Sequence, residues 1–400
     1  MFWGRCGQRL LLPVRTKGGK NDKALHDVYI TRVSGFLPNA PVSNAEMTDF
    51  LGMIDGKPSR AQYIVLRNNG ILQRHYALDR QGRITHSNAQ LVAEAVKGLA
   101  GDGLAVRDLE VLACGTSSPD QFLPSHASQV HGELDHPLEI VSTAGACCTG
   151  MHALKYGYMS VAAGLSRNAV AAGSELVSPM MLARNFERET ERYRQLEQDP
   201  IIGFEKEFLR WMLSDGAAAV LMEPAPRGPL SLRMEWVVSR SFANELDVCM
   251  YSGGDKDEDG RYLGWKHFPP QDLAGRSIFT MKQDVKLLGR NIVPVGVRFL
   301  RETFERYGLD PASIDHMLVH LSSMFFRDKV HDEMVAQGIG VPMSKWFINL
   351  PRVGNVGSAS IFLQLRDLIA VGHVKKGQKV LLMVPESARF SYAFALLTAE

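Results

Sequence analysis

The residues with the clearest chemical potential lie in the stretch 142–151, where small residues and glycines surround two adjacent cysteines, Cys147 and Cys148. The apolar run 138–141 before them is typical of a strand, and the small and apolar residues of 151–163 are typical of a buried helix. A cysteine at a strand-to-helix turn meets unpaired N–H groups and the positive end of the helix dipole. We therefore expect a nucleophilic thiol with a lowered pKa, with two buried structural cysteines as the alternative.

Two further polar side chains stand where predicted elements end. The strand predicted over 314–320 ends in His320, and a glycine-rich turn over 353–358 contains Asn355. Taken alone, His320 is more often a buried histidine whose nitrogens are satisfied than a catalytic group. Gly-Asn is more often a plain turn dipeptide than part of a site. Their value as candidates depends on whether the fold brings them to the cysteines.

Composition limits the classes of function. The chain has 400 residues, is 45% hydrophobic and 22% charged, and has a net charge of +2, so we expect no nucleic-acid partner and no membrane surface. No apolar run approaches the roughly 20 residues of a membrane span. The five cysteines show no paired metal-ligand or disulfide spacing, which predicts no metal site and a reduced, cytoplasmic compartment.

The elements that must position these residues alternate between strand and helix in both halves of the chain, which predicts an α/β fold with largely buried sheets. We expect a disordered basic leader over 1–27, an N-terminal half over 28–225 and a C-terminal half over 226–400. Helices are predicted over 44–53, 88–99, 185–198, 292–307, 325–337 and 360–372. The stretch 60–68 is ambiguous, and 244–270 is predicted to be a long polar loop, either disordered or a lid.

Six segments resemble those of the thiolase superfamily and, within it, of the β-ketoacyl carrier-protein synthase III group, and they follow one another along the chain in the same order as in that group. The Cys148-Thr149-Gly150-Met151 turn is similar to the nucleophile turn Cys-Ala-Gly-Phe of that group. The others are Thr116–Ser118 with Phe122–Ser125, Ser214–Ala217, Ile278–Met281, Ile314-Asp315 with Val319-His320, and Gly354-Asn355 with Ser358–Ser360. Each motif is weak alone, but six in one order are specific at superfamily level.

The resemblance implies a thiolase-like fold: two similar halves, each with a mixed five-stranded sheet, layered α/β/α/β/α, in a homodimer. It implies acyl transfer to a cysteine followed by decarboxylative Claisen condensation. The substrates would be thioesters of coenzyme A or of an acyl carrier protein, and no further cofactor is expected.

Residue by residue, the resemblance makes Cys148 the nucleophile, because it holds the Cys-x-Gly position, with Cys147 as the rival. His320, as a neutral imidazole, and Asn355 would donate hydrogen bonds to the extender carbonyl. The oxyanion hole would use the backbone N–H groups of Cys148 and Ala388. The expected substrate contacts are Arg67, Phe122, Ser323 and Arg389.

Several positions depart from the pattern of the group. Ser387-Ala388-Arg389 replaces three glycines, and Glu386 and Arg389 bring charge to the rim of the site. Ile64 and Asn68 stand where a tryptophan and an arginine clamp the coenzyme A adenine, and Ser323 replaces a water-ordering asparagine. These departures favour a specialised condensing enzyme, as in dialkylresorcinol or pyrone formation. The alternatives are fatty-acid initiation from acyl-coenzyme A and malonyl carrier protein, and a non-condensing acyltransferase or scaffold subunit.

Overall fold

The structure is a computed structural model that describes residues 25–186 and 208–400. The leader predicted over 1–27 lies almost wholly outside the described residues. The same is true of the charged helix predicted over 185–198, apart from its first two residues. Among the described residues, no helix combines the length and the apolar character that crossing a membrane requires.

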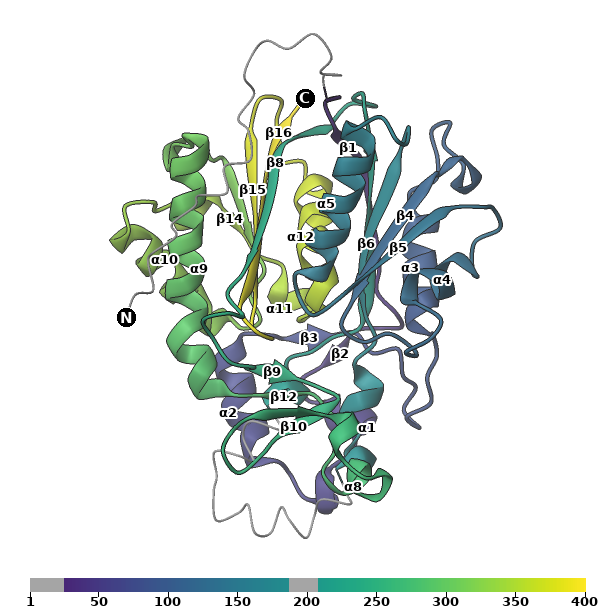
Figure 1. Cartoon of the computed structure of the whole chain (residues 1–400), viewed down its shortest axis with the longest axis vertical. Coiled ribbons are helices and arrows are strands. Elements are labelled where there is room, and N and C mark those ends of the chain that lie inside the picture. Colours follow the sequence, from purple (N-terminus) through teal and green to yellow (C-terminus); the bar gives the residue numbers. More distant parts are fainter. Residues whose placement is uncertain (1–24, 187–207) are drawn as a thin grey trace, which may run out of the picture.

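Ten strands form one continuous sheet in the order β14-β13-β15-β16-β8-β1-β7-β6-β4-β5 (Figure 1). The N-terminal strands are β1 (Tyr29–Phe36), β4 (Val111–Thr116), β5 (Glu139–Ala144), β6 (Ala169–Glu175) and β7 (Gly216–Glu223). The C-terminal strands are β8 (Leu232–Ser241), β13 (His316–Val319), β14 (Trp346–Phe347), β15 (Lys379–Glu386) and β16 (Ser391–Ala399).

The two halves of this sheet repeat one topology. In the N-terminal half β5, β4 and β6 are parallel neighbours, and β7 and β1 continue the sheet in antiparallel fashion. In the C-terminal half β14, β13 and β15 are parallel, and β16 and β8 are antiparallel. The two five-stranded sheets meet edge to edge at β1 and β8, where Tyr29 pairs with Arg233 and Ile30 with Leu232. The predicted pair of mixed five-stranded sheets is confirmed.

Helices complete five layers. The helices α5 (Thr149–Ala162) and α12 (Ser360–Ala370) lie between the two sheets (Figure 1). On the outer faces, α3 (Asn88–Lys97) and α4 (His126–His131) cover the N-terminal sheet, and α9 (Val285–Tyr307) and α10 (Arg327–Ala336) cover the C-terminal one. The predicted α/β/α/β/α order is therefore confirmed.

The central core explains why the two middle helices are fixed. Met151 and Leu154 of α5, Phe362 and Leu365 of α12, and apolar residues of both sheets form one buried cluster. Burying each such side chain contributes about 1.5–3 kcal/mol. The start of α5 also contacts the short helix η11 (Gly357–Ala359), which leads into α12. The two turns that hold Cys147 and Asn355 are thereby brought together.

Local predictions failed where polar contacts organise the chain. The predicted loop 244–270 contains β9 (Met250–Tyr251), β10 (Gly254–Lys256) and β11 (Tyr262–Gly264), because Asp255 of this acidic segment binds Arg276 and Lys282. The ambiguous stretch is α2 (Arg60–Asn69), which begins after a Ser59 cap. The remaining α-helices and strands of the described residues are α1 (Met47–Leu51), α8 (Pro270–Gly275), α11 (Leu350–Val353), β2 (Val42–Ser43), β3 (Gln73–Arg74) and β12 (Lys282–Gln283).

Candidate active site

The two adjacent cysteines lie in the turn between the end of β5 and the start of α5, and their sulfurs have different environments. Cys148 is the N-cap of α5, is fully buried, and its Sγ lies 3.4 Å from the carbonyl oxygen of Val384. Cys147 is half-buried. Cys147 precedes this N-cap in the turn, and only its side chain borders the cavities next to the turn. The structure turns Cys148 into the core.

Two small cavities meet at Cys147. The first, of about 40 Å³, is lined by Cys147, His320 and apolar side chains of α9 and β15. The second, of about 30 Å³, is lined by Cys147, Asn355, Glu175 and a different set of apolar side chains. Ser322 and Ser387 line both cavities. Cys147, not Cys148, is therefore the sulfur that shares these cavities with the imidazole and the carboxamide.

His320 follows β13 and is held as a neutral imidazole. The residue is 2% exposed, and neither ring nitrogen has a hydrogen-bond partner in the described part of the chain. Burial lowers its pKa to about 4. At neutral pH the ring therefore carries one N–H, and that donor is available to a ligand in the first cavity.

Asn355 is positioned by the backbone around it. Its N–H and C=O bond to Met212 and Ser214, and its Oδ1 accepts a hydrogen bond from the Gly357 N–H at 3.0 Å. Because the amide oxygen is occupied within the turn, Nδ2 is the group of this side chain left to donate to a ligand. That is the role a thioester carbonyl requires.

Glu386, the last residue of β15, lies behind the nucleophile turn. Side chains alternate along a strand, so Pro385 and Ser387 line the first cavity while Glu386 points toward the start of α5. Its Oε2 accepts hydrogen bonds from the N–H groups of Cys148 at 2.9 Å and Ala146 at 3.2 Å. The Cys148 N–H that we expected in an oxyanion hole is therefore already engaged by a carboxylate.

The other expected oxyanion donor also lies apart from the cavities. Ala388 is half-buried, and its carbonyl accepts hydrogen bonds from the N–H groups of Cys249 and Met250. It lines neither cavity. The strained position of this hairpin is Phe390, whose φ is 56°, so the replaced glycines at 387–389 do not need the left-handed conformation here.

The electrostatics of the turn correct our expectation of an acidic thiol. Burial raises the pKa of Cys147 well above its ordinary value, and the carboxylates of Glu386 and Glu175 raise it further. Burial and Glu386 raise the pKa of Cys148 in the same way. The helix dipole does not prevail, because the N–H groups at this end of α5 already face a carboxylate.

Comparisons with known proteins show which proteins the chain is similar to. Residues 304–397 match the family described as 3-oxoacyl-[acyl-carrier-protein] synthase III, C-terminal. The β-ketoacyl-[acyl-carrier-protein] synthase III of Clostridium perfringens is 26% identical over 353 residues, which cover 87% of this chain and 92% of the relative. Synthase III 1 of Deinococcus radiodurans is 24% identical, with 90% of each chain covered.

Solved structures show the same fold. AbyA1, a tetronic acid condensing enzyme, superposes with a TM-score of 0.71 at 20% identity and covers 93% of this chain and 99% of its own. OleA of Xanthomonas campestris superposes with a TM-score of 0.69 at 18% identity and covers 94% and 100%. Together these similarities support a β-ketoacyl synthase III-like condensing enzyme with the fold of the thiolase superfamily. Its reaction class is acyl transfer.

The substrate contacts that we expected in this synthase III-like enzyme do not gather at the cavities. Arg67 is exposed on α2, and Phe122 is 72% exposed and stacks on Trp265. Ser323 is buried and its hydroxyl accepts a hydrogen bond from the Phe325 N–H. Arg389 is exposed and donates to the Leu246 carbonyl. None of these four residues lines either cavity.

Sequence reasoning missed three polar residues of the synthase III-like site. Glu175 is buried at the end of β6 and accepts hydrogen bonds from the hydroxyls of Ser117 and Ser118. Burial raises its pKa. The only sequence signal was a charged residue that ends an otherwise apolar strand. Ser322 and Ser387 adjoin recognised positions, but their directions depend on tertiary structure.

Proposed function

We propose that this condensing enzyme transfers an acyl group from a thioester to the sulfur of Cys147 and then joins it to a second acyl thioester by Claisen condensation. The observation that carries the proposal is that the His320 cavity and the Asn355 cavity meet at Cys147. Cys148 held the Cys-x-Gly position in the sequence, but its sulfur is buried against Val384 and lines neither cavity. Cys147 therefore takes the role that we predicted for Cys148.

The steps follow from the groups present. The Cys147 sulfur attacks the thioester carbonyl, the bond to the carrier sulfur breaks, and the thiol proton leaves with that sulfur. The second thioester then places its carbonyl oxygen between the His320 N–H and the Asn355 Nδ2. Loss of carbon dioxide from the second thioester leaves an enolate there, and these two preformed donors stabilise its charge. The enolate carbon attacks the acyl carbonyl, and Cys147 leaves and regains a proton.

Apolar side chains line part of each of the two cavities. This supports the joining of two acyl chains in a specialised lipid or polyketide pathway, such as dialkylresorcinol or pyrone formation. Beyond His320, the first cavity is lined by Leu288, Ile292 and Val293 of α9. The second is lined by Met212, Met250 and Met281 among others. Methionine side chains are flexible, so the second cavity can widen around an acyl chain.

The proposal includes the setting of the reaction. We propose that an acyl carrier protein or coenzyme A delivers the thioesters, that no further cofactor takes part, and that the enzyme works in the cytoplasm. We also propose a homodimer. Its support is β5, which lies at the edge of the sheet with Glu139, Ser142 and Ala144 exposed, because an unpaired strand edge offers its backbone groups to a second chain.

Intact-protein mass spectrometry after incubation with a panel of acyl thioesters tests the assignment. Cys147→Ala is expected to abolish the acyl adduct and Cys148→Ala to retain it; an adduct that survives only in Cys147→Ala would refute the assignment. Asn355→Ala is expected to self-acylate but to lose condensation. If Asn355→Ala still forms condensed product, the reaction does not use this amide. If only malonyl carrier protein extends the acyl-enzyme, the enzyme is a fatty-acid initiation synthase instead.

A further inference from the structure

A single carboxylate oxygen accepts two backbone hydrogen bonds from the turn that contains Cys147. Oε2 of Glu386 accepts from the N–H groups of Ala146 and Cys148, the residues on either side of Cys147. The Glu386 side chain comes from the C-terminal sheet, whereas the turn belongs to the N-terminal half. The contact thus spans the two halves at the position of the nucleophile.

The Glu386 carboxylate lies where its charge affects the ionisation of the Cys147 thiol. Glu386 is 7% exposed, and no salt bridge joins it to a cation in the described part of the chain. Its other oxygen, Oε1, accepts no hydrogen bond from the described residues. A buried charge without a cationic partner acts strongly on its neighbours, because little solvent screens it.

We propose that Glu386 is a positioning residue that directs Cys147 into the cavities and Cys148 into the core, and that keeps Cys147 protonated until a thioester is bound. The inference rests on the proposed role of Cys147. By occupying the two N–H groups, the carboxylate cancels the part of the helix end that would otherwise stabilise a thiolate. A protonated thiol is also less prone to oxidation than a thiolate.

The other titratable groups around the turn do not substitute for Glu386. Glu175 of β6 shares the second cavity with Cys147, but hydroxyl and N–H donors from Ser117, Ser118 and Ser358 surround its carboxylate. The remaining groups that face the two cysteines from neighbouring elements are neutral at pH 7: His320 after β13, and Tyr392 of β16, which faces Cys148.

The test measures thiol reactivity in the full-length protein. Wild type and Glu386→Gln are alkylated with iodoacetamide across pH 6–10, and fragment-ion mass spectrometry assigns the label to Cys147 or Cys148. The side-chain amide oxygen of the Glu386→Gln variant accepts the same two N–H bonds, while the negative charge is lost. We expect the pH midpoint for Cys147 to fall by about one unit, which makes alkylation about tenfold faster near pH 7.

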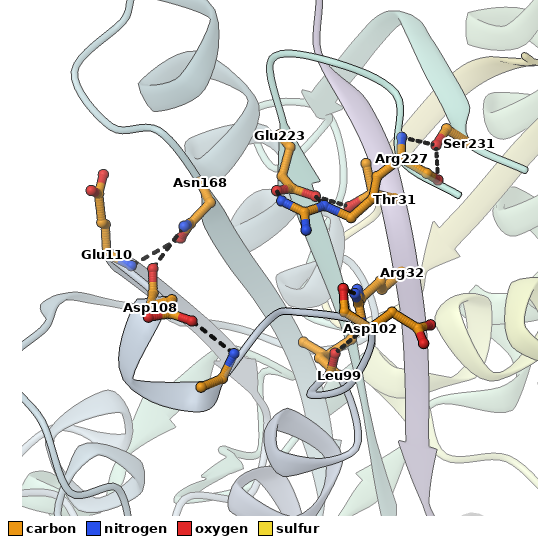
Figure 2. A network of polar contacts seen from close by, with 11 residues as sticks. Thr31, Arg32, Leu99, Asp102, Asp108, Glu110, Asn168, Glu223, Arg227 and Ser231 are labelled. Atoms are coloured by element: carbon orange, nitrogen blue, oxygen red, sulfur yellow. Dashed lines mark hydrogen bonds and ion pairs between the residues drawn. The ribbon is translucent and has the colours of Figure 1, made fainter. Parts of the chain in front are cut away.

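Glu223→Gln is the matched control, since Glu223 is 8% exposed and lies at the far end of β7. Figure 2 shows its carboxylate bound to Thr31 and Arg227, in a polar network that includes neither cysteine. We expect its Cys147 profile to match that of wild type. A second variant, Glu386→Ala, removes the acceptor, and we expect Cys148 to become labelled as the turn loosens.

An unchanged Cys147 profile in folded Glu386→Gln would overturn the inference. If that variant does not fold, wild type still decides: a Cys147 midpoint at or below an ordinary thiol value of 9.0 contradicts the proposed role. Acyl-enzyme formation is measured in parallel. If wild type acylates Cys147 but the profile does not move, only the role of Glu386 fails; if Cys147 is never acylated, the proposed function fails.

Discussion

The close approach of Gly173 in β6 to the turn that carries Asn355 offers a sensitive test of the proposed geometry. At Gly173 an added Cβ would lie 2.7 Å from the carbonyl carbon of Ser358 and 3.0 Å from the N of Ala359. Ordinary contacts of this kind begin near 3.4 Å, so Gly173→Ala must push the turn away by about 0.5–1 Å. The displaced atoms are backbone, which a side-chain rotation cannot relieve.

The expected magnitude has two parts. Overpacking of this kind costs about 1–3 kcal/mol of unfolding free energy. Asn355 lies three residues before Ser358, so the same shift moves its Nδ2 relative to Cys147. A misplacement of about 1 Å at a reacting centre costs on the order of 10²-fold in rate. We expect condensation to fall about 100-fold, and self-acylation of Cys147, which does not need Asn355, to fall less than about tenfold.

The assay compares the two half-reactions in one preparation. Acyl-enzyme formation is followed by intact mass, and condensed product is followed from the acyl-enzyme plus an extender thioester. Gly289→Ala in α9 is the control, because no atom lies within 4 Å of its added Cβ and alanine stabilises a helix by up to about 1 kcal/mol. Wild-type condensation by folded Gly173→Ala would refute the proposed coupling between β6 and the Asn355 turn. Equal losses in both half-reactions would refute the separate role of Asn355.

Three further predictions follow from buried groups. Burial lowers the pKa of folded His320 to about 4 from an ordinary 6.5, so the unfolded chain binds more protons than the folded chain between these pH values. The free energy of unfolding therefore falls as the pH falls through this window. Urea titrations should show that His320→Asn loses about 3 kcal/mol less of this free energy than wild type does between pH 6.5 and pH 4. Glu175→Ala strands the donors of Ser117 and Ser358, and we expect calorimetry to show a loss of about 2–4 kcal/mol, whereas an unchanged Tm would contradict this. Cys148→Ala should cost about 1–2 kcal/mol in the same measurement, because it empties part of a packed core.

The architecture was largely predictable because its causes are local. Apolar runs, turn residues and caps recur along the chain at strand and helix spacing, and this alternation indicated buried sheets. The start of α9 was missed because Gly289 and Pro294 interrupt an otherwise helical pattern, yet the Asp284 cap and packing against β15 and β16 sustain the helix from Val285. Propensity is a weak guide where tertiary contacts compensate.

The sequence by itself determined that a thiol, an imidazole and a carboxamide were the groups to examine, because their side-chain chemistry and their positions at the ends of elements are visible in one dimension. Only the tertiary structure decided which of two adjacent cysteines faces the cavities, since that choice depends on the rotation of the first turn of α5. It also decided that Glu386, from the other half of the chain, approaches the backbone beside Cys147. A contact across 238 residues depends on how two sheets pack around a helix, and no local pattern of residues encodes that distance.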